Sequence, residues 1–459
     1  MRRPASAGPS PPGAGPRTTT PVLGFCSSAQ RAVAAAAGEV AGDPTRPTFH
    51  FLPPAQWMND THGAFYLNGH YHVFYQFQPW HDMSGSDQTA EGIGWGHARS
   101  PDLVRWEFLP PALLPLADQG ERGLASGSAC IRVDGVPMLF YTRTPFGTPE
   151  NKREAWGALP ADDELLTWRR VDLGLRAGQS GVPADIRFNW ADMYVFAVGG
   201  RTFATFKEAN GLVVEARDEA LTQWQAVGFL GSGPHVLDYG YGGAGYDDPP
   251  SLSRGLYGTT VFEDAAGDPA GRTILLGWVS GFRTGRGWRG CMSLPRVLSI
   301  REGVLIQRPL PELRQLRGDH VRRDDLVVAS GTRRVDGVRG DALEIVAELD
   351  RGSVAACGLR LRCGSNGMGG LEIRWSDDGL LVAGTRIDTN EPVLRRRHDG
   401  RLTLHLFLDR SVMELFINDG AATVTRVNYP DDEDRDVALF ADDGEARAVS
   451  LDVWQLAAS

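Results

Sequence analysis

The chain contains 459 residues, of which 42% are apolar and 23% are charged. Such a length suits two or three domains with sizeable cores, and such a composition is typical of a soluble globular protein, which argues against wholesale disorder and against membrane-spanning segments. The net charge is −10, so no global basic field is available to hold a polyanion, and we expect neither nucleic acid nor a membrane as a partner.

Residues 1–48 are predicted to lie outside the folded core. Residues 1–38 contain four arginines and no Asp, Glu or Lys, among many Ala, Ser, Thr, Pro and Gly. This composition is typical both of a disordered tail and of an organelle transit peptide, and both interpretations stay open. A secretory signal fits less well, because Pro21 and Arg31 interrupt the apolar stretch that it needs. We therefore favour a cytoplasmic or organellar protein over a secreted one.

Residues 49–313 consist of short β-like runs. Apolar and polar residues alternate with a period of two between Gly, Pro and Asp residues, in the stretches 63–77, 128–142, 193–206 and 256–279. Phrases centred on tryptophan recur at residues 102–106, 166–168 and 221–224. Such repetition is typical of a β-propeller, in which each four-stranded blade is one repeat. The roughly 265 residues of this region suit about five blades of the usual length.

The character of the sequence changes after residue 313. Residues 320–459 contain alternating strands such as 402–408 and 412–417, and the second of these ends at the turn Asn418-Asp419-Gly420. The simplest domain of this kind is a β-sandwich. The predicted fold is therefore all-β, with a five-bladed β-propeller at residues 49–313 followed by a C-terminal β-sandwich at residues 320–459.

Several phrases, in a fixed order, carry a family resemblance. They are QWMND at 56–60, YQFQP at 75–79, WGHARSPDLVRW at 95–106, SGS at 126–128, GWV at 277–279, SLPR at 293–296 and DRSVMELFINDG at 409–420. Together they resemble glycoside hydrolase family 32, the group of invertases, inulinases and levanases. The resemblance covers nearly everything after residue 48, and it implies the same propeller and sandwich. Asp409 and Glu414, in the last phrase, are expected to be structural or interfacial.

The resemblance implies retaining hydrolysis of a β-fructofuranosyl bond by three carboxyl groups, without a cofactor. One Asp is the nucleophile, a Glu is the acid/base, and another Asp holds the sugar hydroxyls. Retention requires the nucleophile and the acid/base to lie about 5 to 5.5 Å apart. Crowding by neighbouring carboxylates would raise the pKa of the acid/base. No spacing of His and Cys residues suggests a metal site, and we predict none.

The three carboxyl groups map onto Asp60, Asp192 and Asp247. Asp60 matches the nucleophile of the family phrase W-M-N-D-P-N-G, although the following Pro-Asn is Thr-His here. Asp192 matches the stabilising Asp of R-D-P, with Ala191 in place of the arginine. Asp247 matches the acid/base of E-C-P, and its side chain is one methylene shorter than the family's Glu. These departures from the family phrases lie beside the predicted catalytic residues, whereas the phrases that belong to the scaffold are mostly intact.

Four further residues are candidates for contact with the sugar. Asn59 and Gln76 are predicted to hydrogen-bond sugar hydroxyls, although turn chemistry and a satisfied polar strand residue are the ordinary alternatives. Ser126 resembles the sugar-contacting serine of the family's S-G-S phrase, with Ala125 where an aromatic residue is expected. Trp57 is predicted to line the propeller funnel, with core packing as its alternative.

The leading hypothesis is a retaining β-fructofuranosidase that acts on sucrose or a fructan, with a small-molecule or oligosaccharide substrate as its partner. Two alternatives stay open. A fructoside-binding descendant with little or no activity would fit the altered motifs around Asp192 and Asp247. A fructosyltransferase would share the covalent intermediate and differ only in whether a sugar or water accepts the fructosyl group. The sequence leaves the oligomeric state open.

Overall fold

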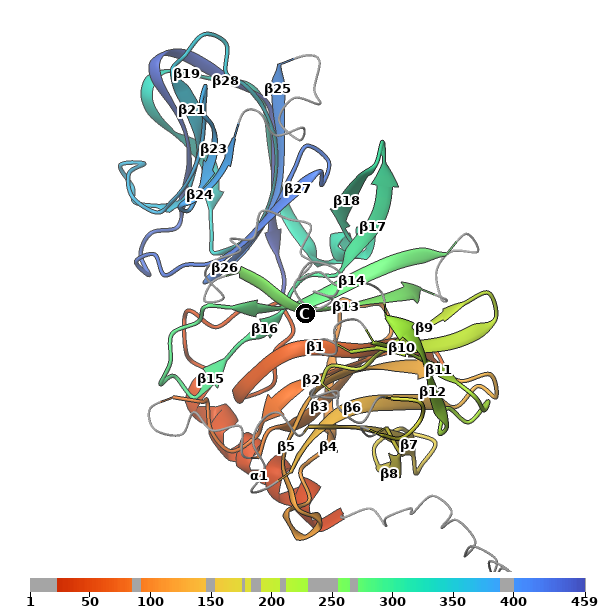
Figure 1. Cartoon of the computed structure of the whole chain (residues 1–459). Helices are drawn as coiled ribbons and strands as arrows, with labels where there is room; N and C mark the ends of the chain where they lie inside the picture. The colour runs from red at the N-terminus through yellow and green to blue at the C-terminus, as the bar shows by residue number, and fades with distance from the viewer. Residues whose placement is uncertain are drawn as a thin grey trace, which may run out of the picture.

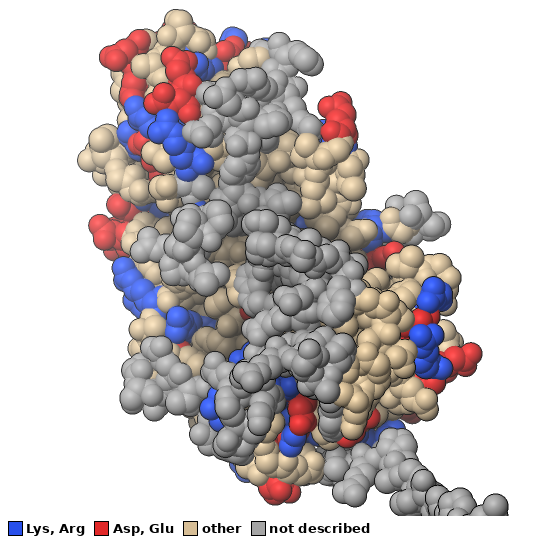
Figure 2. Space-filling view, viewed as in Figure 1, with Lys and Arg blue, Asp and Glu red and all other residues tan. Residues whose placement is uncertain are grey.

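The computed structural model describes residues 23–84, 92–145, 153–175, 178–182, 191–206, 212–229, 255–264, 271–388 and 400–458. Almost all of their regular structure is β-strand, as predicted. Two β-domains lie one above the other, and the C-terminus is found at their junction (Figure 1). Charged side chains of both signs are interspersed over both domains on the face shown in Figure 2.

A helix occupies part of the segment that was expected to be unstructured. Helix α1 spans Leu23–Val40 and lies along the lower edge of the propeller (Figure 1). Its run of alanines favours the helical backbone, and its residues Ala29, Val33 and Val40 are buried. The prediction of a disordered tail is therefore wrong for residues 23–48, while residues 1–22 lie outside the described residues. No helix in the described part of the chain is long and apolar enough to cross a membrane.

The propeller consists of four sheets in the described residues, and nearly all of their strand pairs are antiparallel. The first contains β1 (Gln56–Leu67), β2 (His70–Gln78), β3 (Gly94–Ser100) and β4 (Glu107–Leu113). The second contains β5 (Glu121–Ile131), β6 (Pro137–Pro145), β7 (Glu154–Pro160) and β8 (Trp168–Asp172). The third contains β9 (Tyr194–Val198), β10 (Arg201–Thr205), β11 (Leu212–Ala216) and β12 (Trp224–Phe229). The fourth contains β13 (Gly255–Asp264), β14 (Arg272–Ser280), β16 (Cys291–Met292), β17 (Arg296–Arg301) and β18 (Val304–Pro309).

The first strand of each sheet lies towards the middle of the propeller. Strand β1 packs against β5 on one side and β13 on the other, and β5 packs against β9. Strand β15 (Trp288–Arg289), which follows β14 in the chain, pairs in parallel with β1 and so links the last sheet to the first. The described residues thus form four blades rather than the predicted five.

The recurring tryptophan phrases form the same corner in successive blades. In the second sheet, the Asp162 carboxylate accepts the backbone N–H groups of the following turn, Leu165 has a positive φ of 58°, and Trp168 Nε1 donates to the Leu165 carbonyl at 3.0 Å. The third sheet repeats these three roles with Asp218, Leu221 and Trp224. This structural repeat explains the sequence repeat, because each blade must turn its chain before its outermost strand.

The second domain is a single ten-stranded sheet that curls back on itself. Its strands are β19 (Arg317–Arg339), β20 (Ala342–Asp350), β21 (Ala356–Cys363), β22 (Leu371–Ser376), β23 (Gly379–Val382), β24 (Thr385–Asp388), β25 (Arg401–Asp409), β26 (Val412–Ile417), β27 (Ala422–Val427) and β28 (Asp436–Leu456). One end of β28 pairs with β21 and the other with β20, so this strand runs through both halves. One core contains Leu359 and Ile373 from one half and Leu404 and Leu415 from the other, as in a sandwich.

A buried charged cluster joins the two domains. His50 precedes the propeller, and its ring lies between Asp409 Oδ2 at 2.8 Å and Glu414 Oε1 at 3.2 Å, both from the second domain. Glu414 also accepts hydrogen bonds of 2.6 Å from the backbone N–H of Leu294 and from Arg296 Nη2 of β17. All four charged side chains are at most 1% exposed. This confirms the interfacial role predicted for Asp409 and Glu414.

Candidate active site

Three neighbouring inner strands are irregular where they approach one another. The pairing register shifts at residues 59–60 of β1, at residue 126 of β5 and at residues 258–259 of β13. A bulge of this kind bends a strand and redirects a side chain, and it is frequent beside active sites. The three bulges bring Asp60, Ser126 and Gly258 together, although these residues are far apart in the sequence.

The Asp60 carboxylate is held by the next blade. Ser126 Oγ donates a hydrogen bond of 2.7 Å to Asp60 Oδ2. The backbone N–H of Asp60 donates to the side-chain oxygen of Asn59 at 2.5 Å. Asp60 is only partly buried, whereas Ser126 is 8% exposed. Ser126 thus fixes the Asp60 carboxylate at Oδ2, while the Oδ1 atom is buried on the side that faces Gly258.

Strand β13 supports Asp60 from the opposite side. Gly258 has φ +52°, and a Cβ atom placed on it would lie 2.4 Å from Asp60 Oδ1 and 2.8 Å from Asp60 Cα. Any side chain at this position would therefore collide with the carboxylate. Thr61 Oγ1 donates a hydrogen bond of 2.9 Å to the Gly258 carbonyl, which keeps the two strands in this close contact.

A buried threonine connects Asp192 to the same site. Asp192 lies two residues before β9 and has a positive φ of 54°. Its backbone N–H donates to Thr142 Oγ1 at 2.9 Å, and Thr142 Oγ1 donates to the Ser126 carbonyl at 2.8 Å. Thr142 is 1% exposed. The backbone at Asp192 is thus tied to the residue that holds Asp60, through one side chain of β6.

The other predicted residues lie nearby with different degrees of burial. Gln76 is half-buried on β2, in register with Trp95 of β3. Trp57 belongs to β1 and is only 6% exposed. Asn59 uses its side-chain oxygen to accept the Asp60 N–H. Asp247, the third predicted carboxyl group, lies outside the described residues.

His62, which stands where the family phrase W-M-N-D-P-N-G has Asn, has a packing role. His62 is fully buried, and its ring centroid lies 3.9 Å from that of Trp95. Trp95 Nε1 in turn donates to the carbonyl of Ala125 at 3.0 Å, one residue before Ser126. Burial lowers the pKa of His62 to about 3, so this imidazole is neutral at ordinary pH. It supports the wall of the site and does not supply a proton.

Two residues of the site were not foreseen from the sequence. Thr142 carries no motif of its own, and only its pairing opposite Ala125 in the β5–β6 hairpin indicates its position. Gly258 lies 198 residues from Asp60 in the chain and gives no sign of that proximity. The sequence signal for it was a glycine within an otherwise alternating strand, which often marks a bulge or a close backbone approach.

Comparisons with known proteins agree with this architecture. The family description "Glycosyl hydrolases family 32 N-terminal domain" matches residues 50–176, and "Glycosyl hydrolases family 32 C terminal" matches residues 312–455. The levanase of Bacillus subtilis (strain 168) is 27% identical over an alignment that covers 90% of this chain and 70% of the levanase. A sucrose-6-phosphate hydrolase of Zymomonas mobilis subsp. mobilis is 26% identical, with 89% of this chain and 92% of that protein covered.

Solved structures show the same fold. The exo-inulinase of Aspergillus awamori superimposes with a TM-score of 0.72 at 17% identity, covering 91% of this chain and 99% of that one. Fructan 1-exohydrolase IIa of Cichorium intybus gives a TM-score of 0.70 at 19% identity, covering 91% and 98%. The family matches extend over more than half of the chain and lie in both domains. The chain therefore belongs to glycoside hydrolase family 32.

Proposed function

We propose that this glycoside hydrolase cleaves the β-fructofuranosyl bond of sucrose or a fructan with retention of configuration. The observation that carries the proposal is the Asp60 carboxylate, held by Ser126 where the bulges of β1, β5 and β13 converge. The names of the relatives support the substrate class, because they are a levanase, sucrose-6-phosphate hydrolases and fructan-cleaving enzymes.

In the first step, one oxygen of Asp60 attacks the anomeric carbon of the fructosyl unit. The acid/base, which we assign to Asp247, donates its proton to the glycosidic oxygen as the bond between that oxygen and the anomeric carbon breaks. The products are the free leaving group and a fructosyl ester of Asp60. Asp192 accepts hydrogen bonds from sugar hydroxyls and holds the ring as positive charge develops on it.

In the second step, water attacks the anomeric carbon of the ester. Asp247, now ionised, takes a proton from that water, and the Asp60 oxygen leaves as a carboxylate. Fructose is released and both carboxyl groups return to their initial protonation states. Because the anomeric carbon is inverted twice, its configuration is retained overall.

The contacts around Asp60 favour this role. A hydrogen bond donated to a carboxylate orients it and stabilises its negative charge, which is what Ser126 supplies at 2.7 Å. Gly258 leaves room for the carboxylate on the other side. Gln76, Trp57 and the side-chain amide of Asn59 are assigned to the sugar site, with Asn59 donating from its NH₂ group while its oxygen accepts the Asp60 N–H.

The test is release of fructose and glucose from sucrose, inulin and levan by the purified protein. Asp60→Asn should abolish turnover while leaving the fold intact, because an amide is not an effective nucleophile at this carbon. The matched control is Asp118→Asn, which changes an exposed aspartate of the 3₁₀ helix η2 (Ala117–Gln119) and should keep full activity.

Three results would change the assignment. Full activity of the Asp60→Asn variant would refute the nucleophile. Release of glucose without equal free fructose from sucrose would indicate that a sugar accepts the fructosyl group, as in a transferase. Product of inverted configuration in the first minutes of reaction, followed by NMR, would exclude the two-step mechanism.

A further inference from the structure

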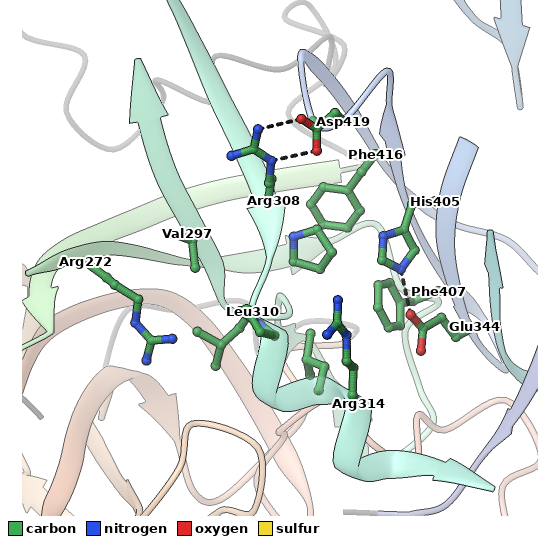
Figure 3. A pocket seen from close by; sticks show the side chains of 14 residues that line it. Arg272, Val297, Arg308, Leu310, Arg314, Glu344, His405, Phe407, Phe416 and Asp419 are labelled. Carbon is green, nitrogen blue, oxygen red and sulfur yellow. Dashed lines mark hydrogen bonds and ion pairs between the residues drawn. The ribbon is translucent and has the colours of Figure 1, made fainter. Parts of the chain in front are cut away.

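A hollow lies between the two domains. It has a volume of about 380 Å³ and shares no lining residue with the candidate active site. Its walls come from β17, β18 and the 3₁₀ helix η4 (Pro311–Leu316) on one side, and from β25 and β26 on the other (Figure 3). Leu310 and the rings of Phe407 and Phe416 give it an apolar lining. A hollow of this size suits a small ligand.

Most of the charged groups in this pocket are already paired. Arg308 makes two hydrogen bonds to the carboxylate of Asp419, from Nε at 2.7 Å and from Nη2 at 2.5 Å. His405 Nε2 lies 2.7 Å from Glu344 Oε1. Glu344 also receives two hydrogen bonds from Arg317, at 2.7 and 2.6 Å. These pairs hold their side chains in place and still present N–H groups and oxygens to the pocket.

Arg314 differs from the other cations. It lies on η4, is exposed, and forms no ion pair with any of the described residues. Figure 3 shows its guanidinium directed into the pocket, towards the wall formed by His405 and Phe407. The remaining lining cation, Arg272, is paired with Asp264 and Glu312. Arg314 therefore gives the pocket one positive charge that the described carboxylates do not balance.

We propose that this pocket binds a monosaccharide that carries one anionic group, either a phosphate or a carboxylate. The guanidinium of Arg314 matches the anionic group, since arginine binds both groups through paired N–H donors. The Arg308–Asp419 and His405–Glu344 pairs offer donors and acceptors to sugar hydroxyls, and the apolar wall packs against the C–H face of the ring. The ligand would touch both domains and so stabilise their association.

The binding test uses the full chain and isothermal titration calorimetry. The probes are fructose 6-phosphate, glucuronate, inorganic phosphate and neutral fructose. We expect one site per chain for fructose 6-phosphate or glucuronate, and the comparison of these two distinguishes a phosphate from a carboxylate. Fructose and inorganic phosphate, which each lack half of the recognised chemistry, should bind at least tenfold more weakly.

The variants locate the site. Arg314→Ala should weaken binding by about tenfold to a hundredfold, which is the usual effect of losing a charged hydrogen bond, and Arg314→Lys should restore part of it. The matched control is Arg333→Ala, which removes an exposed arginine of β19 that does not line the pocket. Both alanine variants should keep the hydrolytic activity and melting temperature of the parent, so a loss of binding cannot be assigned to misfolding.

Four results would overturn the proposal. They are undetectable binding of both anionic sugars, binding of an anionic sugar that Arg314→Ala leaves unchanged, Arg314-dependent binding of fructose as tight as that of its phosphate, and binding that is lost in Ser126→Ala but kept in Arg314→Ala. The last result would place the anionic sugar in the candidate active site. Because the readout is binding and not turnover, failure here leaves the proposed hydrolysis untouched, and failure of hydrolysis leaves this site untouched.

Discussion

At the scale of single residues, the site depends on the absence of a side chain as much as on the presence of functional groups. Gly258 lets β13 approach within van der Waals contact of Asp60, and its left-handed backbone follows the bulge. Ser126 and Thr142 then fix the two aspartates relative to the second blade. The two aspartates are thus positioned by neighbouring residues. Two of these neighbours, Thr142 and Gly258, belong to no recognisable motif.

Gly258→Ala is predicted to reduce kcat by at least about a hundredfold, because the new Cβ would displace the Asp60 carboxylate by an ångström or more. It should also destabilise the protein by roughly 1–2 kcal/mol, since L-residues are disfavoured at a left-handed φ. Steady-state kinetics and urea unfolding measure the two effects.

The matched control for this change is Gly135→Ala. Gly135 has φ +81° but no atom within 4 Å of the Cβ position, so it shares the backbone cost without the collision. We expect Gly135→Ala to lose roughly 1–2 kcal/mol of stability, no more than Gly258→Ala, and to keep kcat unchanged. Equal loss of activity in both variants would show that backbone strain, and not contact with Asp60, is responsible.

At the scale of elements, the segment after α1 fastens the joint between the first and last sheets. The Asp43 carboxylate accepts hydrogen bonds from Thr45, from Arg286 Nη1 at 3.0 Å and from Trp288 Nε1 at 2.9 Å. Trp288 belongs to β15, the strand that pairs with β1. Residues 41–48 therefore help to hold the first and last sheets of the propeller together, although their position in the chain suggested that they belong to a tail.

Asp43→Asn is predicted to lower the free energy of unfolding at pH 7 by about 1 kcal/mol, since the site is partly exposed. Burial raises the pKa of Asp43, but hydrogen bonds from Thr45, Trp288 and Arg286 outweigh it and lower the pKa to about 2. The contribution is therefore complete above the unfolded-state pKa near 4 and is lost as the pH falls towards 2.

Urea unfolding between pH 7 and pH 3 tests this prediction. The gap between the parent and the Asp43→Asn variant should narrow as the pH falls, whereas the exposed control Asp118→Asn should show no comparable gap at any pH. A gap that stays constant over this range would mean that the ionised carboxylate is not the stabilising species.

At the scale of the whole molecule, the two domains share a buried titratable cluster. Burial alone would lower the pKa of His50, but the hydrogen bonds and charges of Asp409 and Glu414 prevail and raise it to about 9. Arg296 lies on the other side of Glu414, so the cluster contains two cations and two carboxylates. Protonated His50 donates to one carboxylate from each ring nitrogen.

This arrangement predicts a loss of stability in mildly alkaline solution. The folded-state pKa of His50 lies above its unfolded value near 6.5, so its contribution is complete below pH 6.5 and is lost as the pH rises through 9. We expect the free energy of unfolding to fall by up to about 3 kcal/mol between pH 6.5 and pH 9.5. His50→Gln should be less stable at pH 7 and should lose most of this pH dependence.

The control for this prediction is His320→Gln. His320 also faces a carboxylate, Asp452, at 2.8 Å, but its side chain is 40% exposed. Its removal should leave the alkaline decline of the parent in place. Thermal unfolding from pH 6.5 to pH 9.5 measures all three proteins, and a parent whose stability is flat over this range would contradict the assignment of charge to His50.

Local patterns in the sequence were enough to predict the class of fold and the family. Alternation with a period of two, turn residues and the tryptophan phrases are local properties, since they reflect which side chains a strand can bury and how a chain can turn. Asp60 and Ser126 were predicted from their phrases, and the interfacial role of Asp409 and Glu414 followed in the same way. Helix α1 was missed, because an alanine-rich segment takes its stability from what it packs against.

The contacts between these elements could not be predicted from local patterns and are visible in the folded chain alone. The contact of Ser126 with Asp60 joins residues 66 apart, and that of Thr61 with Gly258 joins residues 197 apart. Both depend on bulges in three different strands and on closure of the ring by β15, which no local pattern encodes. The same holds for the number of blades, for the burial of His50 between the domains and for the pocket beside Arg314. Each of them depends on residues that become neighbours only when the whole chain has folded.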